Sequence, residues 1–179
     1  MTPDGELVSR TLAHDDRAAF GELVQRHQSA VRRFLRHLTR GDNALADDLA
    51  QDAFVQAYRS LPAFRQDAAF ATWLLGIAHN HWRNARRKQR TVPLEPGHLA
   101  ALDPQPSAAL ASDLRQDLAQ AMQHLAPDEQ TALHLTYQHG LTHTEITAVV
   151  GWPLGTVKTH LARGKDKLRT LLAPWNPQT

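Results

Sequence analysis

The sequence predicts an all-α protein made of two small helical domains joined by a flexible linker. Apolar residues recur at helical spacing along almost all of the 179 residues, and no run of four or more residues alternates cleanly between apolar and polar. The segment Val92–Ala111 breaks this periodicity, because it contains four prolines and no Lys or Arg. The predicted domains therefore cover residues 1–91 and 112–175, and the linker covers residues 92–111.

Composition excludes several classes of protein. The chain has no cysteine, which removes disulfide scaffolds, thiolate zinc sites and cysteine nucleophiles. Its hydrophobic content of 42% is enough for packed cores, yet no apolar run approaches the roughly 20 residues that a membrane helix needs. The first ten residues lack both the basic start and the apolar stretch of a signal peptide. We expect a soluble, cytoplasmic protein.

The formal net charge of +2 conceals two positive blocks. Residues 53–91 carry a net charge of +6 and residues 151–179 carry +4. The intervening residues 92–112 and 113–150 carry −2 and −4. This segregation predicts a polyanion bound at two places, with acidic surfaces left for another partner.

The first predicted domain has four helices. In order, they are expected at Glu6–Ala13, Asp16–Thr39, Ala44–Ser60 and Ala69–Gln89. Gly41-Asp42-Asn43 forms the turn before the third helix. Pro62 ends that helix, since the residue before a proline avoids the helical region, and Pro62–Asp67 forms a loop. The apolar face of the second helix is predicted to be Phe20, Leu23, Val24, Val31, Leu35 and Leu38.

The third predicted helix has two distinct faces. Positions 46, 49, 50, 53, 54, 57, 58 and 61 are Ala, Leu or aromatic and form a core-facing stripe. The opposite face carries Asp47, Asp48, Gln51 and Asp52. A solvated face is the commoner use of such charges, and a docking surface for a basic partner is the functional alternative. Metal binding is a weaker alternative, because neighbouring helical carboxylates do not by themselves form an oxygen cage.

The fourth predicted helix is basic towards its C-terminus and has aromatic residues near its start. Five cations lie within residues 83–90, which is more than helix capping needs and suits contacts with phosphates. Phe64 and Arg65 in the preceding loop, and Trp73 on the first turn, could stack on unpaired bases, although core packing is the simpler role for each aromatic alone. The expected buried face is Phe70, Trp73, Leu74, Ile77, Ala78 and either His81 or Trp82. A polar stripe of Asn80, Arg83, Asn84 and Arg87 favours binding of single-stranded nucleic acid.

The second domain is predicted to be a four-helix domain that contains a helix-turn-helix. Its helices are expected at Ser112–Leu125, Asp128–His139, Thr142–Val150 and Pro153–Leu172. Gly151 suits a tight turn with positive φ, and Pro153 can open the last helix. The inward residues are Ile146, Val150, Val157, Leu161, Leu168 and Leu172. The outward hydroxyls and cations of the last helix, which suit a DNA major groove, are Thr156, Lys158, Thr159, His160 and Arg163. An ordinary helical hairpin with a solvated face is the alternative.

Taken together and in this order, these segments resemble a bacterial extracytoplasmic-function (ECF) sigma factor of RNA polymerase. The region 2 resemblance lies in Asp48-Leu49-Ala50-Gln51-Asp52-Ala53-Phe54, in Phe64-Arg65, in Phe70-x-x-Trp73-Leu74 and in Ile77-Ala78-x-Asn80. The region 4 resemblance lies in Leu125-Ala126-Pro127-x-x-x-x-x-Leu133, in Gly140-Leu141-Thr142-x-x-Glu145-Ile146 and in Gly155-Thr156-Val157-Lys158-Thr159-x-Leu161. Each fragment alone is weak, but their order and spacing are specific.

The resemblance implies a role for each set of residues. Asp47, Asp48, Gln51 and Asp52 would dock on the clamp helices of the largest polymerase subunit. Phe64, Arg65, Trp73, Asn80, Arg83, Asn84 and Arg87 would recognise and melt the minus-ten element. Thr156, Lys158, Thr159, His160 and Arg163 would read the minus-thirty-five element. The flap region of the polymerase would be a further contact, and the linker would thread towards the RNA exit path. The resemblance also implies an anti-sigma partner, which in many members of the family is membrane-bound, and a role in stress responses.

Two other classes of function are alternatives to this interpretation of the sequence. A free-standing helix-turn-helix regulator would bind duplex DNA alone, but it would need neither the acidic stripe nor the aromatic loop. A nucleic-acid-processing enzyme would need a catalytic set, and no nucleophile–base pair or phosphate-binding loop is visible. Of the 11 histidines, only His139 and His143 flank a turn at ligand spacing, and no third ligand is evident near them. We therefore expect no cofactor, no metal and no enzymatic activity.

Overall fold

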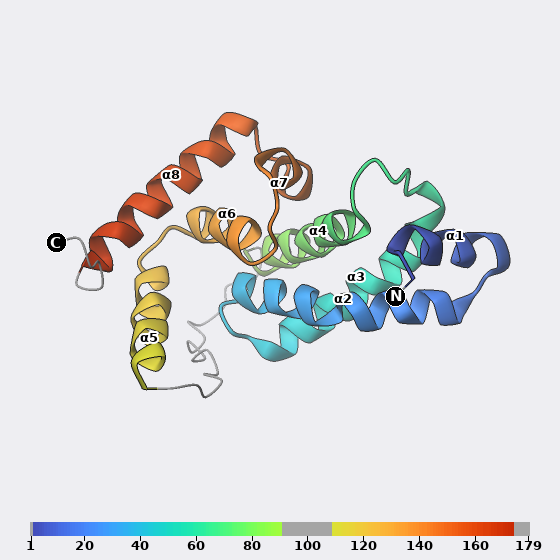
Figure 1. The fold of residues 1–179 in the computed structure, drawn as a ribbon, viewed down its shortest axis with the longest axis horizontal. Helices are drawn as coiled ribbons and strands as arrows, with labels where there is room; N and C mark the ends of the chain where they lie inside the picture. The colour runs from blue at the N-terminus through green and yellow to red at the C-terminus, as the bar shows by residue number, and fades with distance from the viewer. Residues whose placement is uncertain (1, 91–108, 174–179) are drawn as a thin grey trace. The chain divides into compact units, whose positions relative to one another are not determined.

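The computed structural model describes residues 2–90 and 109–173, and these residues form two helical units (Figure 1). The helices are α1 (Asp4–His14), α2 (Arg17–Leu38), α3 (Asn43–Ser60), α4 (Phe70–Arg90), α5 (Ala109–Gln123), α6 (Pro127–Tyr137), α7 (His143–Val150) and α8 (Leu154–Leu171), with a 3-10 turn η1 (Leu61–Ala63). The first unit contains α1 to α4, and the second contains α5, α6, α8 and the first residues of α7. The all-α fold with a helix-turn-helix in its second part is thus confirmed.

Most of the predicted linker lies outside the described residues. Its last three residues, 109–111, belong to the first turn of α5, so this helix begins three residues earlier than predicted. Small apolar residues such as Ala109 and Ala111 are good helix formers, so the helix can start as soon as the prolines end.

Side-chain caps define where the first helices begin. The Asp16 carboxylate accepts a hydrogen bond from the backbone N–H of Ala19 at 3.0 Å, at the start of α2. Asp42 does the same for Leu45 at 3.0 Å, at the start of α3. These caps satisfy N–H groups that have no partner within the helix. Gly41, with φ of 86°, provides the tight turn between the two helices.

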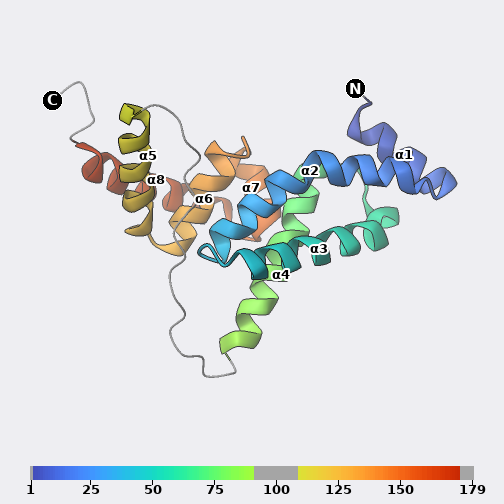
Figure 2. The ribbon, with the colours of Figure 1, turned by 90° about the horizontal axis from the view of Figure 1, so that it is seen from below.

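The core of the first unit lies where α4 crosses the antiparallel pair of α2 and α3. Figure 2 shows α2 and α3 side by side with α4 across them, and all three helices pack on one another. α1 packs along the beginning of α2 and reaches η1. The largest fully buried side chains in this unit are Leu7, Val8, Leu23, Val31, Phe34, Leu35, Leu61 and Leu74. The predicted stripe of α3 is confirmed, since every member is buried except Tyr58, which is half-buried.

The buried arc of α4 differs from the prediction. Leu75 and His79 are buried, whereas Trp73, Ile77, His81 and Trp82 are only half-buried. Because α4 packs on both α2 and α3, its covered arc is wider than the single stripe that periodicity indicates. In α2, the predicted apolar face includes Val24, which is half-buried, and omits Phe34, which is buried.

The second unit is centred on the packing of α6 against α8. Leu133, Leu135, Val157 and Leu161 are buried there. Gly164 allows the close approach of the two helices, because a Cβ at this position would come within 2.9 Å of Leu133 Cδ1. Buried apolar surface therefore holds these helices together, and their closest point depends on a residue without a side chain.

An ion pair between a buried carboxylate and a half-exposed lysine joins α6 to α8. The Glu129 carboxylate accepts hydrogen bonds from Lys167 Nζ at 2.8 and 3.0 Å and from the backbone N–H of Ala126 at 2.9 Å. Burial by itself would raise the pKa of Glu129, but the hydrogen bonds from Lys167 and Ala126 outweigh it and hold the pKa below the ordinary value. The ionised form is therefore the one that stabilises the second unit.

Replacing Glu129 by Gln is expected to lower the free energy of unfolding by about 2 kcal/mol at pH 7, since charge-assisted hydrogen bonds are lost at a buried site. Because the folded pKa is depressed, this contribution is complete above the ordinary value of 4.5 and is lost as the pH falls through the folded pKa. Urea unfolding at several pH values should show wild type and Glu129→Gln converging on the acid side. The exposed pair of Asp166 and Arg169 provides the control, because Asp166→Asn should change little. A pH-independent gap between wild type and Glu129→Gln would contradict this assignment.

Candidate nucleic-acid and protein interfaces

The acidic residues of α3 form one exposed face. Asp47, Asp48, Gln51 and Asp52 are all exposed, opposite the buried stripe of the same helix. Asp47 is half exposed, and its Oδ1 lies 3.4 Å from Nε of Arg32 in α2. Asp48 and Asp52 make no ion pair with any described residue. Two carboxylates on this face are thus available to a basic partner.

The loop before α4 is held by an aromatic cluster made of Phe64, Phe70 and Trp73. The rings of Phe64 and Trp73 stack, with centroids 4.7 Å apart and an interplanar angle of 28°. Phe70 contacts both, edge-on to Phe64 at 5.9 Å and tilted against Trp73 at 5.7 Å. Phe70 is buried, whereas Phe64 and Trp73 are half-buried. The structure therefore stacks Phe64 of the loop on Trp73 of α4, two members of the same predicted set.

This stack decides how the cluster can meet a base. One face of Phe64 is covered by Trp73, so a base can stack only on a surface that the pair leaves open. Arg65 follows directly in the loop, is exposed and has no carboxylate partner among the described residues. An aromatic platform next to a free guanidinium group suits an unpaired nucleotide, whose base stacks and whose phosphate is negatively charged.

The polar stripe of α4 extends from this cluster. Asn80, Arg83, Asn84 and Arg87 are all exposed, and their spacing places them on the same side of the helix as Trp73. Among the described residues, neither arginine of the stripe has an ion pair. Arg86 does not belong to this stripe, and its guanidinium group lies 5.4 Å from the centre of the Trp82 ring. The aromatic cluster and the stripe together form a continuous candidate track for a single strand.

The helix-turn-helix is built as the sequence indicates. Thr142 and Glu145 form a reciprocal cap at the start of α7, in which Glu145 Oε2 accepts from the Thr142 N–H at 2.8 Å and Thr142 Oγ1 accepts from the Glu145 N–H at 3.3 Å. Gly151 has φ of 75°, as expected for the turn. Of the predicted inward residues, Ile146, Val150, Val157 and Leu161 are buried, whereas Leu168 and Leu172 are only half-buried.

The outward residues of α8 do not all face the same way. Thr156, Thr159, His160 and Arg163 lie on one side of the helix at spacings of three and four residues. Lys158 is exposed, but at 100° per residue it lies about 140° around the helix from Arg163. Only the length and flexibility of its side chain could bring its ammonium group to the same ligand. His160 is half-buried, because its ring lies 5.0 Å from that of Trp152 in the turn.

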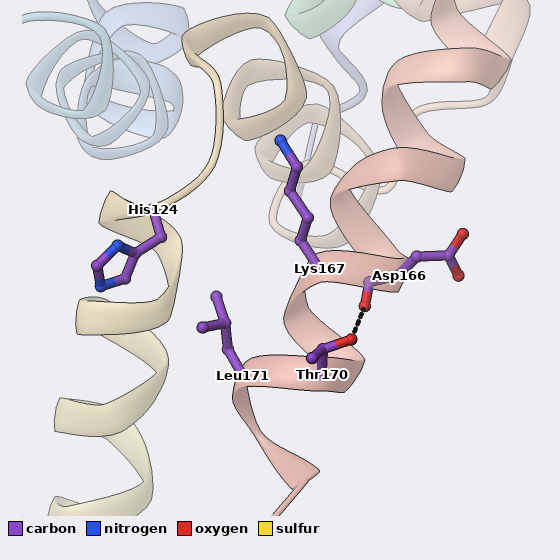
Figure 3. Close-up of a pocket in the computed structure, with 5 residues that line it drawn as sticks. All are labelled: His124, Asp166, Lys167, Thr170 and Leu171. Atoms are coloured by element: carbon purple, nitrogen blue, oxygen red, sulfur yellow. Dashed lines mark hydrogen bonds between the residues drawn. The ribbon is translucent and has the colours of Figure 1, made fainter.

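A shallow hollow lies between α5 and α8 and contains none of the predicted site residues. Figure 3 shows its lining, with the Leu171 side chain directed towards the end of α5 and the Thr170 hydroxyl bonded to the Asp166 carbonyl at 3.1 Å. Its volume is about 450 Å³, and its remaining lining residues are His124 and Lys167. Within the described part of the chain, no three His, Asp or Glu side chains lie close enough to hold a metal ion. None of the described helices is both long and apolar enough to cross a membrane.

Comparison with known families places two matches on these units. Residues 23–92 match sigma-70 region 2, and residues 115–168 match sigma-70 region 4. The first range contains the acidic face, the aromatic cluster and the basic stripe. The second contains the helix-turn-helix.

Whole-chain comparisons agree with these matches. The chain is 31% identical to the ECF RNA polymerase sigma-E factor of Haemophilus influenzae, with 96% of each chain covered. It is 36% identical to the RNA polymerase sigma factor CarQ of Myxococcus xanthus, over 86% of this chain and 89% of that protein. Among solved structures, it is similar to CnrH in complex with the cytosolic domain of CnrY, with a TM-score of 0.68, 26% identity and coverage of 96% and 97% of the two chains. It is also similar to RpoE in complex with the anti-sigma factor NepR from Bartonella quintana, with a TM-score of 0.71, 26% identity and coverage of 86% and 96%.

Proposed function

The chain belongs to the ECF sigma factors of the sigma-70 family, and from this premise we propose how its residues divide the work of transcription initiation. A member of this family directs RNA polymerase to specific promoters. We assign residues 1–91 to core binding and minus-ten recognition, residues 92–111 to a linker towards the RNA exit path, and residues 112–175 to minus-thirty-five recognition. The coexistence of the acidic face and the aromatic cluster in the first unit carries this proposal, since a free-standing DNA-binding regulator needs neither.

Core binding belongs to the acidic face of α3. Asp48 and Asp52 are exposed and unpaired within the described chain, so they can meet the basic clamp helices of the largest subunit without breaking an existing ion pair. Asp47 and Gln51 extend the same face, and Arg32 holds Asp47 in place. Complementary charge at such a surface steers association and sets the docking register.

Promoter melting belongs to the aromatic cluster and the stripe on α4. Phe64, Arg65 and Trp73 capture a flipped base of the minus-ten element, and the contacts made there offset the few kcal/mol of stacking that flipping costs. Asn80, Arg83, Asn84 and Arg87 then hold the backbone of the separated strand.

Duplex recognition belongs to α8. Its outward residues Thr156, Thr159, His160 and Arg163, with Lys158 from the flank, enter the major groove at the minus-thirty-five element. The second unit also contacts the flap region of the polymerase. The ring of Trp152 restrains His160, so the position of this histidine at the DNA is set before binding.

The chain supplies promoter choice and the polymerase supplies the chemistry, so we propose that the chain is not itself an enzyme. We also propose that it works in the cytoplasm, where transcription takes place. Two similar solved structures are complexes with other proteins, one of them named an anti-sigma factor. We propose an anti-sigma partner for this chain as well.

Run-off transcription tests the proposal. The chain is mixed with sigma-free core polymerase and a promoter library, and we expect transcripts that depend on the chain and share minus-ten and minus-thirty-five elements. Core polymerase alone is the control. If the chain gives no stimulation but binds duplex DNA tightly by itself, it is a free-standing regulator and the proposal is wrong.

A further inference from the structure

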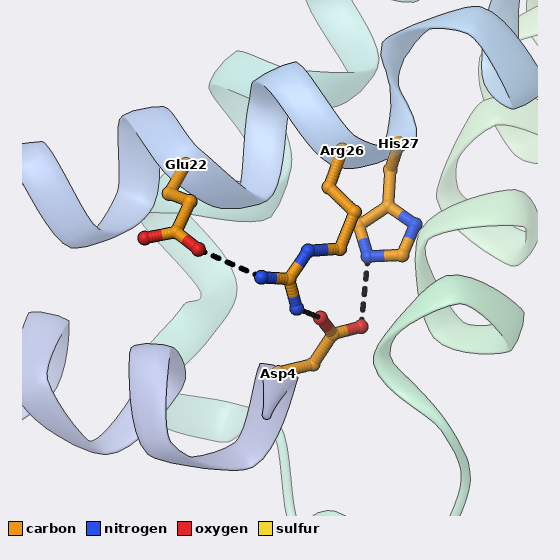
Figure 4. Close-up of polar contacts among 4 residues, drawn as sticks. All are labelled: Asp4, Glu22, Arg26 and His27. Atoms are coloured by element: carbon orange, nitrogen blue, oxygen red, sulfur yellow. Dashed lines mark hydrogen bonds and ion pairs between the residues drawn. The ribbon is translucent and has the colours of Figure 1, made fainter. Parts of the chain in front are cut away.

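Asp4, at the start of α1, is held by two residues of α2 (Figure 4). Its carboxylate pairs with Arg26 through one oxygen, and its other oxygen accepts from His27 Nε2 at 2.8 Å. Arg26 also binds Glu22 at 2.7 Å, which fixes the guanidinium group from the opposite side. The side chains of Asp4, Arg26 and His27 are 27%, 19% and 14% exposed, so this network is more shielded than an ordinary surface ion pair.

The network continues into the aromatic cluster. The His27 ring lies 5.5 Å from the Phe70 ring, and Phe70 is the buried member that contacts both Phe64 and Trp73. Asp4 is therefore separated from the rings that flank the loop by only two intervening side chains. Its neighbour in α1, Gly5, lies close to the Gln66 side chain of the loop, because a Cβ added there would be 3.3 Å from Gln66 Oε1.

The loop itself has little internal support. Phe64 donates to the Leu61 carbonyl at 3.0 Å, but the backbone N–H groups of residues 65–69 make no hydrogen bond with a described residue. Gln66 has φ of 59°, a conformation that is uncommon for a residue with a side chain. A segment with so few backbone hydrogen bonds takes its conformation from the side chains packed against it.

We propose that Asp4 is a positioning residue for the minus-ten loop: through His27 and Phe70 it holds Phe64 and Trp73 in the stacked arrangement that receives the unpaired base. α1 then supports the minus-ten loop during promoter opening, in addition to packing in the core of the first unit. This proposal rests on the proposed function of the loop. In this proposal Asp4 makes no contact with DNA. Replacing Asp4 must therefore loosen the loop in the free chain, and any loss of transcription follows from that loosening.

Hydrogen exchange in the full chain tests the positioning alone. In Asp4→Asn, exchange of the Phe64 amide, the loop N–H that is hydrogen-bonded to the Leu61 carbonyl, is expected to rise about fivefold, while exchange in the middle of α3 stays unchanged. Asp16→Asn is the matched control: Asp16 also bridges α1 and α2, pairing with Arg10 at 2.7 Å, but it touches no residue of the aromatic cluster. It should leave the loop unaffected, and Asn can still cap α2. Unchanged exchange in Asp4→Asn, or an equal rise in both variants, would overturn the proposal.

Promoter opening tests the consequence. On a promoter recovered with the wild-type holoenzyme, permanganate reactivity of unpaired thymines should fall about fivefold in Asp4→Asn, with closed-complex binding unchanged. His27→Gln, which removes the ring against Phe70, should reproduce this result, and the double variant should be no worse than either single one. A loosened loop with normal opening would overturn the proposal. Failure of the proposed function looks different, since the wild type itself would then give no promoter-dependent opening.

Discussion

Reversing Asp48 and Asp52 to Lys is expected to weaken binding to core polymerase by more than about 100-fold, because like charges brought together at an interface cost several kcal/mol. Both side chains are exposed and neither is ion-paired within the described chain, so the fold should survive the change. Binding is measured with labelled chain and sigma-free core polymerase, and the fold is checked by circular dichroism and thermal unfolding.

The control for this experiment changes the total charge equally at another place. Glu6 on α1 and Asp128 on α6 are also exposed and unpaired within the described chain, so the variant Glu6→Lys, Asp128→Lys matches the reversal in charge. It should bind core polymerase nearly as well as the wild type. Equal loss in both variants would show that net charge matters, and full binding by the Asp48, Asp52 variant would show that α3 is not the docking face.

Replacing Trp73 by Ala is expected to reduce open-complex formation about tenfold to a hundredfold, the range that the loss of one base–aromatic stack implies. Closed-complex binding, which we assign to duplex contacts of the second unit, should change little. Permanganate reactivity reports opening, and a gel shift at low temperature reports the closed complex. The Phe64 stack is also lost in this variant, so part of the effect comes from a less ordered loop.

Two further variants separate stacking from helix stability. Trp73→Phe keeps an aromatic ring beside Phe64 and should retain most of the opening activity. Trp82→Ala removes a half-buried ring from the other side of the same helix, where it contacts Arg86, and should affect opening far less. Equal loss of open and closed complexes in Trp73→Ala would mean that Trp73 serves only the core.

The amino-acid sequence by itself was sufficient for the helices and for the two faces of α3, but not for the buried arc of α4. Hydrophobic periodicity repeats at each turn and is local, so the buried stripe of α3 and its acidic face could be assigned without knowing what packs against them. The turn at Gly151 was equally local, because glycine, which has no Cβ, adopts positive φ without steric cost. The order and spacing of short motifs then indicated the family, which the comparisons confirm.

Tertiary structure decided the contacts between residues that are far apart in the sequence. Glu129 pairs with Lys167, 38 residues away, and Asp4 with His27, 23 residues away, and no local pattern marks either pair. The stack of Phe64 on Trp73 likewise depends on how the loop folds back on α4. Periodicity shows which side of a helix is turned inward, but it contains no information about which side chain of another helix lies opposite. The residues that would meet core polymerase and DNA were therefore visible in the sequence, whereas the side chains that hold them in position were visible only in the fold.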